Sequence, residues 1–252
     1  MKNIFDFEMI FTNIPKLLKY LPTTLEIAAI AYIASLIVGF LVALVKIKKT
    51  KVLYQIVSFY VSFCRGTPII VQLYATYFGI PMILQLINAR FGTHLTSSFI
   101  PNIIFALTAL SLNDAAYSSE YIRASIESVE AGQREAAHSI GMTTWQTLRR
   151  IVIPEAMVVA LPSLGNSFIN MIKNTSLAFT CAVIELTAGG QLIAGRNYRF
   201  FEMYVSLAIV YWVVTFILSR VFGLAEKRIR RNEKEVERRA GNQRAAKELP
   251  PA

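Results

Sequence analysis

The feature that most constrains this chain is a long apolar run without a single charge. Ile27–Val45 covers 19 residues, about 28 Å as an α-helix at about 1.5 Å per residue, close to the roughly 30 Å hydrocarbon core of a bilayer. Hydrophobic residues make up 54% of the chain and charged residues 17%, whereas soluble domains have about 45–50% and about 25%. The sequence therefore predicts an all-α integral membrane protein.

Four further apolar stretches predict four more membrane-spanning helices. The second span is expected over Pro68–Leu86, after a shorter surface helix over Val52–Cys64, because proline interrupts the helix before it. The third runs from about Ile100 to Ile122 and contains two acidic residues. The fourth covers Ala156–Ile172, and the fifth covers Met203–Ser219.

About five transmembrane helices place the two chain ends on opposite sides of the membrane. The lysines of 46–51, the pair Arg149 and Arg150, and the tail then share one side, and the opposite loops contain only three arginines. The positive-inside rule puts the N-terminus outside and the C-terminus in the cytoplasm. The expected division is an N-terminal interfacial segment at 1–21, a transmembrane domain at 22–225 with a cytoplasmic loop at 125–154, and a basic cytoplasmic tail at 226–252.

The net charge of +10 raises the question of a nucleic-acid partner, and its distribution argues against one. From Arg220 onwards there are ten basic and five acidic residues, and the remaining positive charge sits in short clusters between apolar runs. That is the pattern of cytoplasmic membrane loops, not of a basic groove. Cys64 and Cys181 lie in or beside apolar segments and are predicted to be buried free thiols, with no disulfide or metal spacing.

The loop at 125–154 is too long and too regular to be a simple connector. Good helix formers occupy Gln133–Ile140, Gly141 can adopt a positive φ that closes this helix, and Thr144 can cap the next one. A loop held between rigid spans on an exposed face is where partner contact tends to occur.

The spacing within this loop resembles a known signature. Glu135–Ala137 (EAA), then three residues, Gly141, nine residues and Ile151–Pro154 (IVIP) resemble the cytoplasmic loop of ATP-binding-cassette importer permeases. The family pattern ends in Ile, any residue, Leu and Pro, so this chain departs from it only at Ile153, an apolar exchange. An ordinary amphipathic connector would match neither this spacing nor this position.

Other stretches narrow the resemblance to permeases for polar amino acids. The sequence RGTP at 65–68 with YFG at 77–79, AAY at 115–117, and KNTSL at 173–177 are similar to motifs of that group. The last departs from the commoner Lys-Asp-Thr-Ser-Leu at Asn174, and an acid-to-amide change bears on the charge of the preferred cargo. The resemblance covers roughly residues 22–225 and leaves the tail uncovered.

The resemblance implies a type I importer permease in a bacterial plasma membrane that moves a polar amino acid, such as cystine, by alternating access. It implies an ATPase subunit, an extracellular solute-binding protein, a second permease copy or paralogue, and membrane lipid as partners. ATP and Mg²⁺ would bind to the ATPase, because this chain lacks a glycine-rich phosphate loop; no catalytic residue, metal or cofactor is expected here. The coupling residues that it implies are Glu135, Ala136, Ala137 and Gly141.

Polar groups within the spans are the candidates for the cargo path, because ionisable residues in a membrane are costly and face the protein interior or water. An amino acid carries an ammonium and a carboxylate, which Glu120 and Lys173 together could meet. Alternatively, Glu120 pairs with Arg123 on its own helix face, Lys173 snorkels to the interface, and Asn170 bonds across a dimer. The candidates are Gln72, Asn113, Glu120, Asn170, Lys173, Asn174, Thr175 and Ser176, with Asp114 a further ionisable group in the third span.

Two other functions stay open on the sequence. A permease of the same kind could carry another small solute, although a metal route would need a denser run of His, Met or acidic residues than this chain has. A membrane scaffold or channel without an ATPase would leave the EAA loop without a purpose. Co-purification with an ATPase separates the last alternative from the others.

Overall fold

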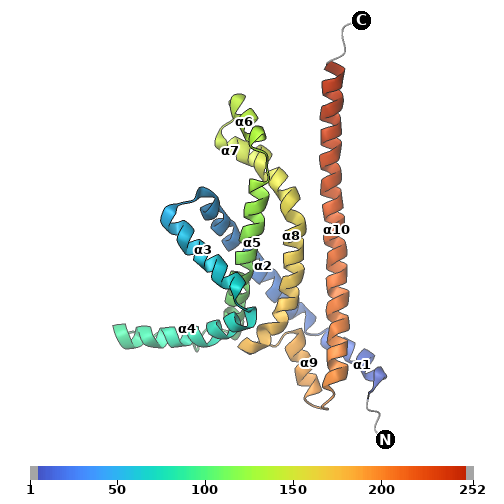
Figure 1. The fold of residues 1–252 in the computed structure, drawn as a ribbon. Helices are drawn as coiled ribbons and strands as arrows, with labels where there is room; N and C mark the ends of the chain where they lie inside the picture. Colours follow the sequence, from blue (N-terminus) through green and yellow to red (C-terminus); the bar gives the residue numbers. More distant parts are fainter. Residues whose placement is uncertain (1–4, 248–252) are drawn as a thin grey trace.

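The computed structural model describes residues 5–247, with side chains as far as Ile229, and every regular element in that part of the chain is helical (Figure 1). In chain order the elements are α1 (Phe7–Leu17), α2 (Leu21–Lys48), α3 (Lys51–Gly66), α4 (Ile69–Phe91), α5 (Asn102–Glu127), α6 (Ala131–Ser139), α7 (Thr144–Thr147), η1 (Leu148–Val152), α8 (Ile153–Asn174), η2 (Thr175–Cys181), α9 (Leu186–Ala194) and α10 (Phe200–Lys247).

Within the described residues, four helical segments are long and apolar enough to cross a membrane. They are α2, α4, the stretch Thr144–Cys181 that contains α8, and α10 as far as Ile229. The first, fourth and fifth predicted spans lie inside these segments, and the second does so except for Pro68, which is the N-cap of α4. The third corresponds to α5, which has 26 residues but carries several charged side chains, so the count of five spans and the orientation of the termini stay predictions.

Helix α5 lies at the centre of the molecule, and α2 makes the most extensive contact with it, followed by α8 and α4. Small buried residues line α5, which lets neighbouring helices come close, as is common between membrane helices. Gly39 of α2 is the tightest point of this contact. A Cβ added there would lie 3.1 Å from the Ala115 carbonyl oxygen and 3.2 Å from the Ser119 nitrogen.

The break predicted at Pro68 is present. Thr67 and Pro68 adopt extended backbone between α3 and α4, because proline disfavours helix in the residue before it. Gln72 stabilises this junction: its Nε2 donates to Thr67 Oγ1 at 2.7 Å and to the Cys64 carbonyl at 2.9 Å. Helix α3 returns from the end of α2 towards the middle of α5, and α4 extends away from the bundle (Figure 1).

The predicted loop helix is α6, and Gly141 has a φ of +83°, the positive value that its position requires. The expected cap at Thr144 is wrong by one residue. Thr143 caps α7 instead, in a reciprocal capping box with Gln146, because a helix starting at Thr144 needs its cap one position earlier. Gln133 Nε2 donates to Glu155 Oε1 at 3.0 Å and so ties α6 to α8.

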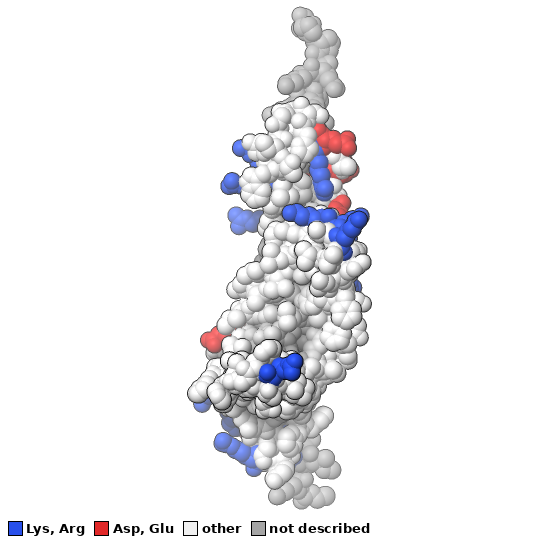
Figure 2. Space-filling view, turned by 90° about the vertical axis from the view of Figure 1, so that its left-hand side faces the viewer, with Lys and Arg blue, Asp and Glu red and all other residues white. Residues whose placement is uncertain are grey.

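The tail continues α10 as one helix through Lys247, and α10 extends past α6 and α7 in the same direction (Figure 1). Charged side chains gather towards that end of the molecule, and much of the surface below them is uncharged (Figure 2). This is the distribution expected of a chain that lies across a bilayer with a basic face in the cytoplasm.

Candidate functional site

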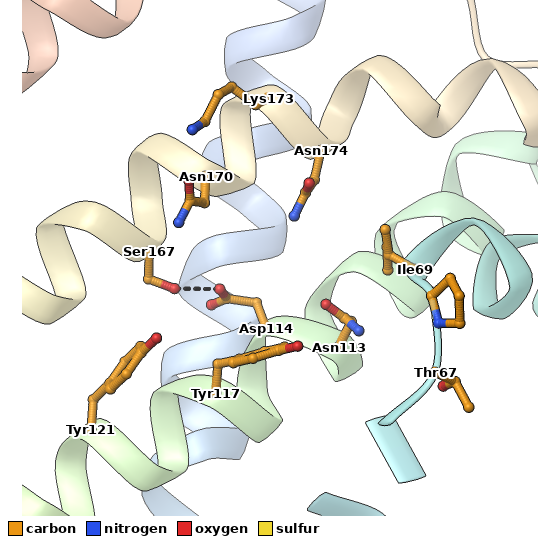
Figure 3. A pocket seen from close by; sticks show the side chains of 11 residues that line it. Thr67, Ile69, Asn113, Asp114, Tyr117, Tyr121, Ser167, Asn170, Lys173 and Asn174 are labelled. Carbon is orange, nitrogen blue, oxygen red and sulfur yellow. Dashed lines mark hydrogen bonds between the residues drawn. The ribbon is translucent and has the colours of Figure 1, made fainter. Parts of the chain in front are cut away.

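A cavity of about 600 Å³ lies between α5, α8 and the junction of α3 with α4 (Figure 3). We call it the central cavity. Its volume falls in the range of about 300–1,000 Å³ that small-molecule sites occupy. The helices that form it come from distant parts of the sequence, and α5 supplies one wall while α8 supplies the facing one.

Asp114 of α5 provides the negative charge of the central cavity, and it is only 9% exposed. Three serine hydroxyls from three helices donate to its carboxylate: Ser35 of α2 at 2.6 Å, Ser118 of α5 at 3.1 Å and Ser167 of α8 at 2.5 Å. None of the salt bridges found among the described side chains involves Asp114. Since a carboxylate has about four acceptor positions, one remains for a further donor.

The opposite wall carries a positive charge and two amides. Asn170, Lys173 and Asn174 lie three and four residues apart on α8, so they share one helix face. Figure 3 shows Asn170 and Asn174 directed from α8 towards the side of the cavity that holds Asp114 and Asn113. The lining of the cavity thus combines one carboxylate, one ammonium group and three amides, the groups that a small zwitterionic molecule can bind.

Four predicted path residues line the central cavity: Asn113, Asn170, Lys173 and Asn174. The other four predicted residues lie elsewhere. Gln72 accepts a hydrogen bond from Asn113 Nδ2 at 3.1 Å and lies behind the cavity wall. Glu120 forms salt bridges with Lys46 of α2 and with Arg123, whose NH2 lies 2.7 Å from Glu120 Oε2. Thr175 and Ser176 donate to carbonyls of their own chain segment, those of Ile172 at 2.7 Å and Lys173 at 2.6 Å.

The sequence analysis named Asp114 as an ionisable candidate of the third span without including it in the set of path residues, and it did not single out Tyr117, Tyr121 or Ser167 for the path; all four line the central cavity. One signal was available, because residues 114, 117 and 121 are three and four apart and share a face of α5. Ser167 gave the same signal, because it lies three residues before Asn170 and seven before Asn174 and so shares their face of α8.

The loop that contains α6 and α7 presents a second candidate surface. Glu135 and Ala136 are exposed and Ala137 is buried. Two large apolar side chains stand out beside them, Ile140 at 79% exposed and Trp145 at 65% exposed. Apolar residues displayed on a charged loop are typical of a protein contact.

Comparison with known proteins agrees with this geometry. Residues 35–231 match the family described as "Binding-protein-dependent transport system inner membrane component". The chain is 44% identical over 225 residues to the probable amino-acid ABC transporter permease protein PatM of Vibrio harveyi, covering 89% of this chain and 96% of the relative. It is 39% identical over 236 residues to the L-cystine transport system permease protein TcyL of Bacillus subtilis strain 168, covering 94% and 96%.

A solved structure has the same fold. The crystal structure of an amino acid ABC transporter with histidines superimposes with a TM-score of 0.74 at 33% identity, covering 89% of this chain and 99% of that one. With its all-helical architecture, apolar spans and matching residues 35–231, this chain belongs to the family of inner-membrane components of binding-protein-dependent transport systems, the permeases of ATP-binding-cassette importers.

Proposed function

We propose that this chain forms the translocation path for a polar amino acid in an ATP-driven importer. The observation that carries the proposal is the central cavity, where Asp114 and Lys173 supply opposite charges on facing helices. The names of the relatives support the same cargo class, because one is a cystine permease and the similar solved transporter was crystallised with histidines.

In this proposal the cargo ammonium binds Asp114 and its carboxylate binds Lys173. The three serine hydroxyls on Asp114 hold its carboxylate oxygens in place and leave an acceptor position for the ammonium. The amides of Asn113, Asn170 and Asn174 bind the polar part of the cargo side chain. An amide in the place of the commoner aspartate at 174 favours a cargo whose side chain has no strong positive charge.

The chain performs no bond chemistry in this proposal, and a separate ATPase subunit binds ATP and Mg²⁺. Glu135, Ala136 and Gly141 belong to the coupling surface, where the small Ala136 side chain lets α6 approach the ATPase closely. Ile140 and Trp145 extend that surface with apolar area. A solute-binding protein delivers the cargo, and a second permease copy or paralogue completes the path.

The experiment reconstitutes the chain in liposomes with its candidate ATPase and supplies a solute-binding protein loaded with each amino acid in turn. We expect one polar amino acid to stimulate both ATP hydrolysis and uptake. Asp114→Asn keeps the acceptor oxygen but loses the charge, and a charge-assisted hydrogen bond contributes about 1.5–3 kcal/mol, so uptake should fall roughly 10- to 100-fold.

The matched control is Asp6→Asn, at the N-cap of α1, where asparagine caps as well as aspartate does. This control should transport like the natural chain. Unchanged uptake by Asp114→Asn would contradict the cargo site. Failure of any ATPase to assemble with the chain would contradict the importer and favour a scaffold or channel.

A further inference from the structure

A second cavity, of about 610 Å³, lies on the other side of Tyr117. We call it the inner cavity. It is bounded by Lys46 at the end of α2, by one face of α3, and by Tyr117 and Glu120 of α5. Tyr117 lines both this cavity and the central one, so a single side chain is part of the partition between them.

The face of α3 that lines the inner cavity is polar. Ser58, Ser62 and Arg65 recur at helical spacing and all line it, whereas Phe59 and Phe63 are exposed and apolar. A helix with one polar and one apolar face turns the polar face towards water or a ligand. Ser58 Oγ is buried without a hydrogen-bond partner, which is unusual for a polar atom and indicates a place where a donor or acceptor is missing.

The charges in the inner cavity leave one cation unpaired. Glu120 is neutralised by Lys46 and by Arg123. Arg65 forms none of the salt bridges found among the described side chains, and its guanidinium carbon lies 5.5 Å from the centre of the Tyr117 ring. Among the described side chains, the cavity therefore has an excess positive charge at the partition, where Arg65 makes a cation–π contact with Tyr117.

The position of Arg65 along α3 favours a site for the cargo over a site for a lipid headgroup. Arg65 follows Lys51 by 14 residues, about 21 Å along α3 at about 1.5 Å per residue. Figure 1 shows α3 leading from the turn after α2 to the level where α4 begins. Arg65 therefore lies two residues before the Thr67 and Pro68 wall of the central cavity, at the end of α3 that is farthest from Lys51.

We propose that the inner cavity is a second station for the amino acid, in which Arg65 binds the cargo carboxylate after Tyr117 moves aside. This rests on the proposed function, in which the central cavity is the first station. The inner cavity contains Lys46, the first of the lysines that the positive-inside rule assigns to the cytoplasm, so it follows the central cavity on the inward route.

The stacking of Arg65 on Tyr117 gives the partition two states. With no cargo, the guanidinium holds the ring between the cavities. A carboxylate offers Arg65 paired, charge-assisted hydrogen bonds, which are stronger than a cation–π contact at a partly exposed site. Arrival of the carboxylate therefore draws Arg65 from the ring and frees Tyr117 to move.

The test uses the assembled transporter in liposomes and measures uptake, cargo-stimulated ATP hydrolysis, and cargo exchange without ATP. Arg65→Gln should lower the ratio of cargo uptake to ATP hydrolysis by roughly two- to fivefold. This is the change that the loss of one exposed cation–π contact makes to the equilibrium between the two states of the partition. Arg65→Lys, which keeps the charge, should restore part of the ratio. Tyr117→Ala should raise exchange without ATP, because the partition is gone.

The controls are Arg90→Gln, which also removes an arginine from the last turn of a helix, and Tyr74→Ala, which removes an exposed tyrosine of α4. Neither residue lines the two cavities, and neither variant should change the ratio or the exchange. The proposal is overturned if Arg65→Gln keeps the natural ratio, or if Tyr117→Ala exchanges no faster than Tyr74→Ala. If Asp114→Asn also leaves uptake unchanged, the first station fails as well; if Asp114→Asn lowers uptake, only the second station is wrong.

Discussion

Glu185 shows how much one buried side chain can hold together. It is fully buried between η2 and α9, and its Oε1 accepts from the Thr187 and Ala188 backbone nitrogens, both at 2.9 Å. Its Oε2 accepts from the Tyr211 hydroxyl of α10 at 3.1 Å. One carboxyl group therefore caps α9 and ties it to α10. Burial raises the pKa of this carboxyl above its ordinary value, although the hydrogen bonds oppose the shift.

The raised pKa predicts a pH dependence of stability. The folded chain binds a proton at Glu185 more tightly than the unfolded chain does, so the free energy of unfolding falls as pH rises from the ordinary value near 4.5 through the folded pKa. Glu185→Gln keeps an acceptor oxygen and removes the titration. The melting temperature of this variant minus that of the natural chain should therefore increase as pH rises from 4.5 to 8.

Thermal unfolding in nanodiscs at several pH values measures this difference. The control is Glu8→Gln, at an exposed glutamate of α1. It shows how much the melting temperature changes when an acidic residue is removed from the surface. The prediction is wrong if the difference in melting temperature between Glu185→Gln and the natural chain stays constant or decreases as pH rises. That result would show that folding does not disfavour the ionised form of Glu185.

At the scale of elements, the contact between α2 and α5 depends on the missing side chain at Gly39. A methyl group there would lie within 3.1–3.2 Å of backbone atoms of Ala115 and Ser119, and backbone cannot move as easily as a side chain. Gly39→Ala should destabilise the chain by about 1–3 kcal/mol, the usual effect of overpacking. The midpoint of denaturant-induced unfolding in detergent measures this loss.

The same glycine-to-alanine change at Gly79 is the matched control. Gly79 lies in α4, and no atom would come within 4 Å of an added Cβ. Alanine favours a helix interior over glycine by about 0.5–1 kcal/mol, so Gly79→Ala should not lower the unfolding midpoint. Equal midpoints for the two variants would show that α2 and α5 can separate slightly without loss of stability.

The elements that sequence reasoning located correctly depend on local chemistry. The apolar length of α2, the break at Pro68 and the positive φ of Gly141 each follow from residues within a few positions. The partners of Asp114 and Glu120 could not be found in this way. Ser35 and Lys46 lie 79 and 74 residues from the carboxylates that they bind, so only the packing of α2 along α5 decides which acid faces a cavity and which is neutralised.

At the scale of the whole molecule, the orientation in the membrane follows from charge. The basic loops and the tail lie towards the same end as α6 and α7 (Figures 1 and 2), and an excess of Lys and Arg marks the cytoplasmic side. The loop between α4 and α5 should therefore face outwards, and α6 should face inwards. Both native cysteines, Cys64 and Cys181, are buried, so an introduced cysteine can be labelled against a low background.

Two exposed serines provide the sites for this measurement, Ser98 in the loop between α4 and α5 and Ser139 at the end of α6. In sealed cells, a membrane-impermeant thiol reagent should label Ser98→Cys at once and Ser139→Cys only after the membrane is permeabilised. The reverse pattern would place α6 outside the cell. The EAA loop could not then contact a cytoplasmic ATPase, and the inner cavity would open towards the side from which cargo arrives. The positions of the two cavities relative to each other in the fold are the same in either orientation. The orientation in the membrane therefore decides whether cargo that enters from outside meets the central cavity before the inner cavity.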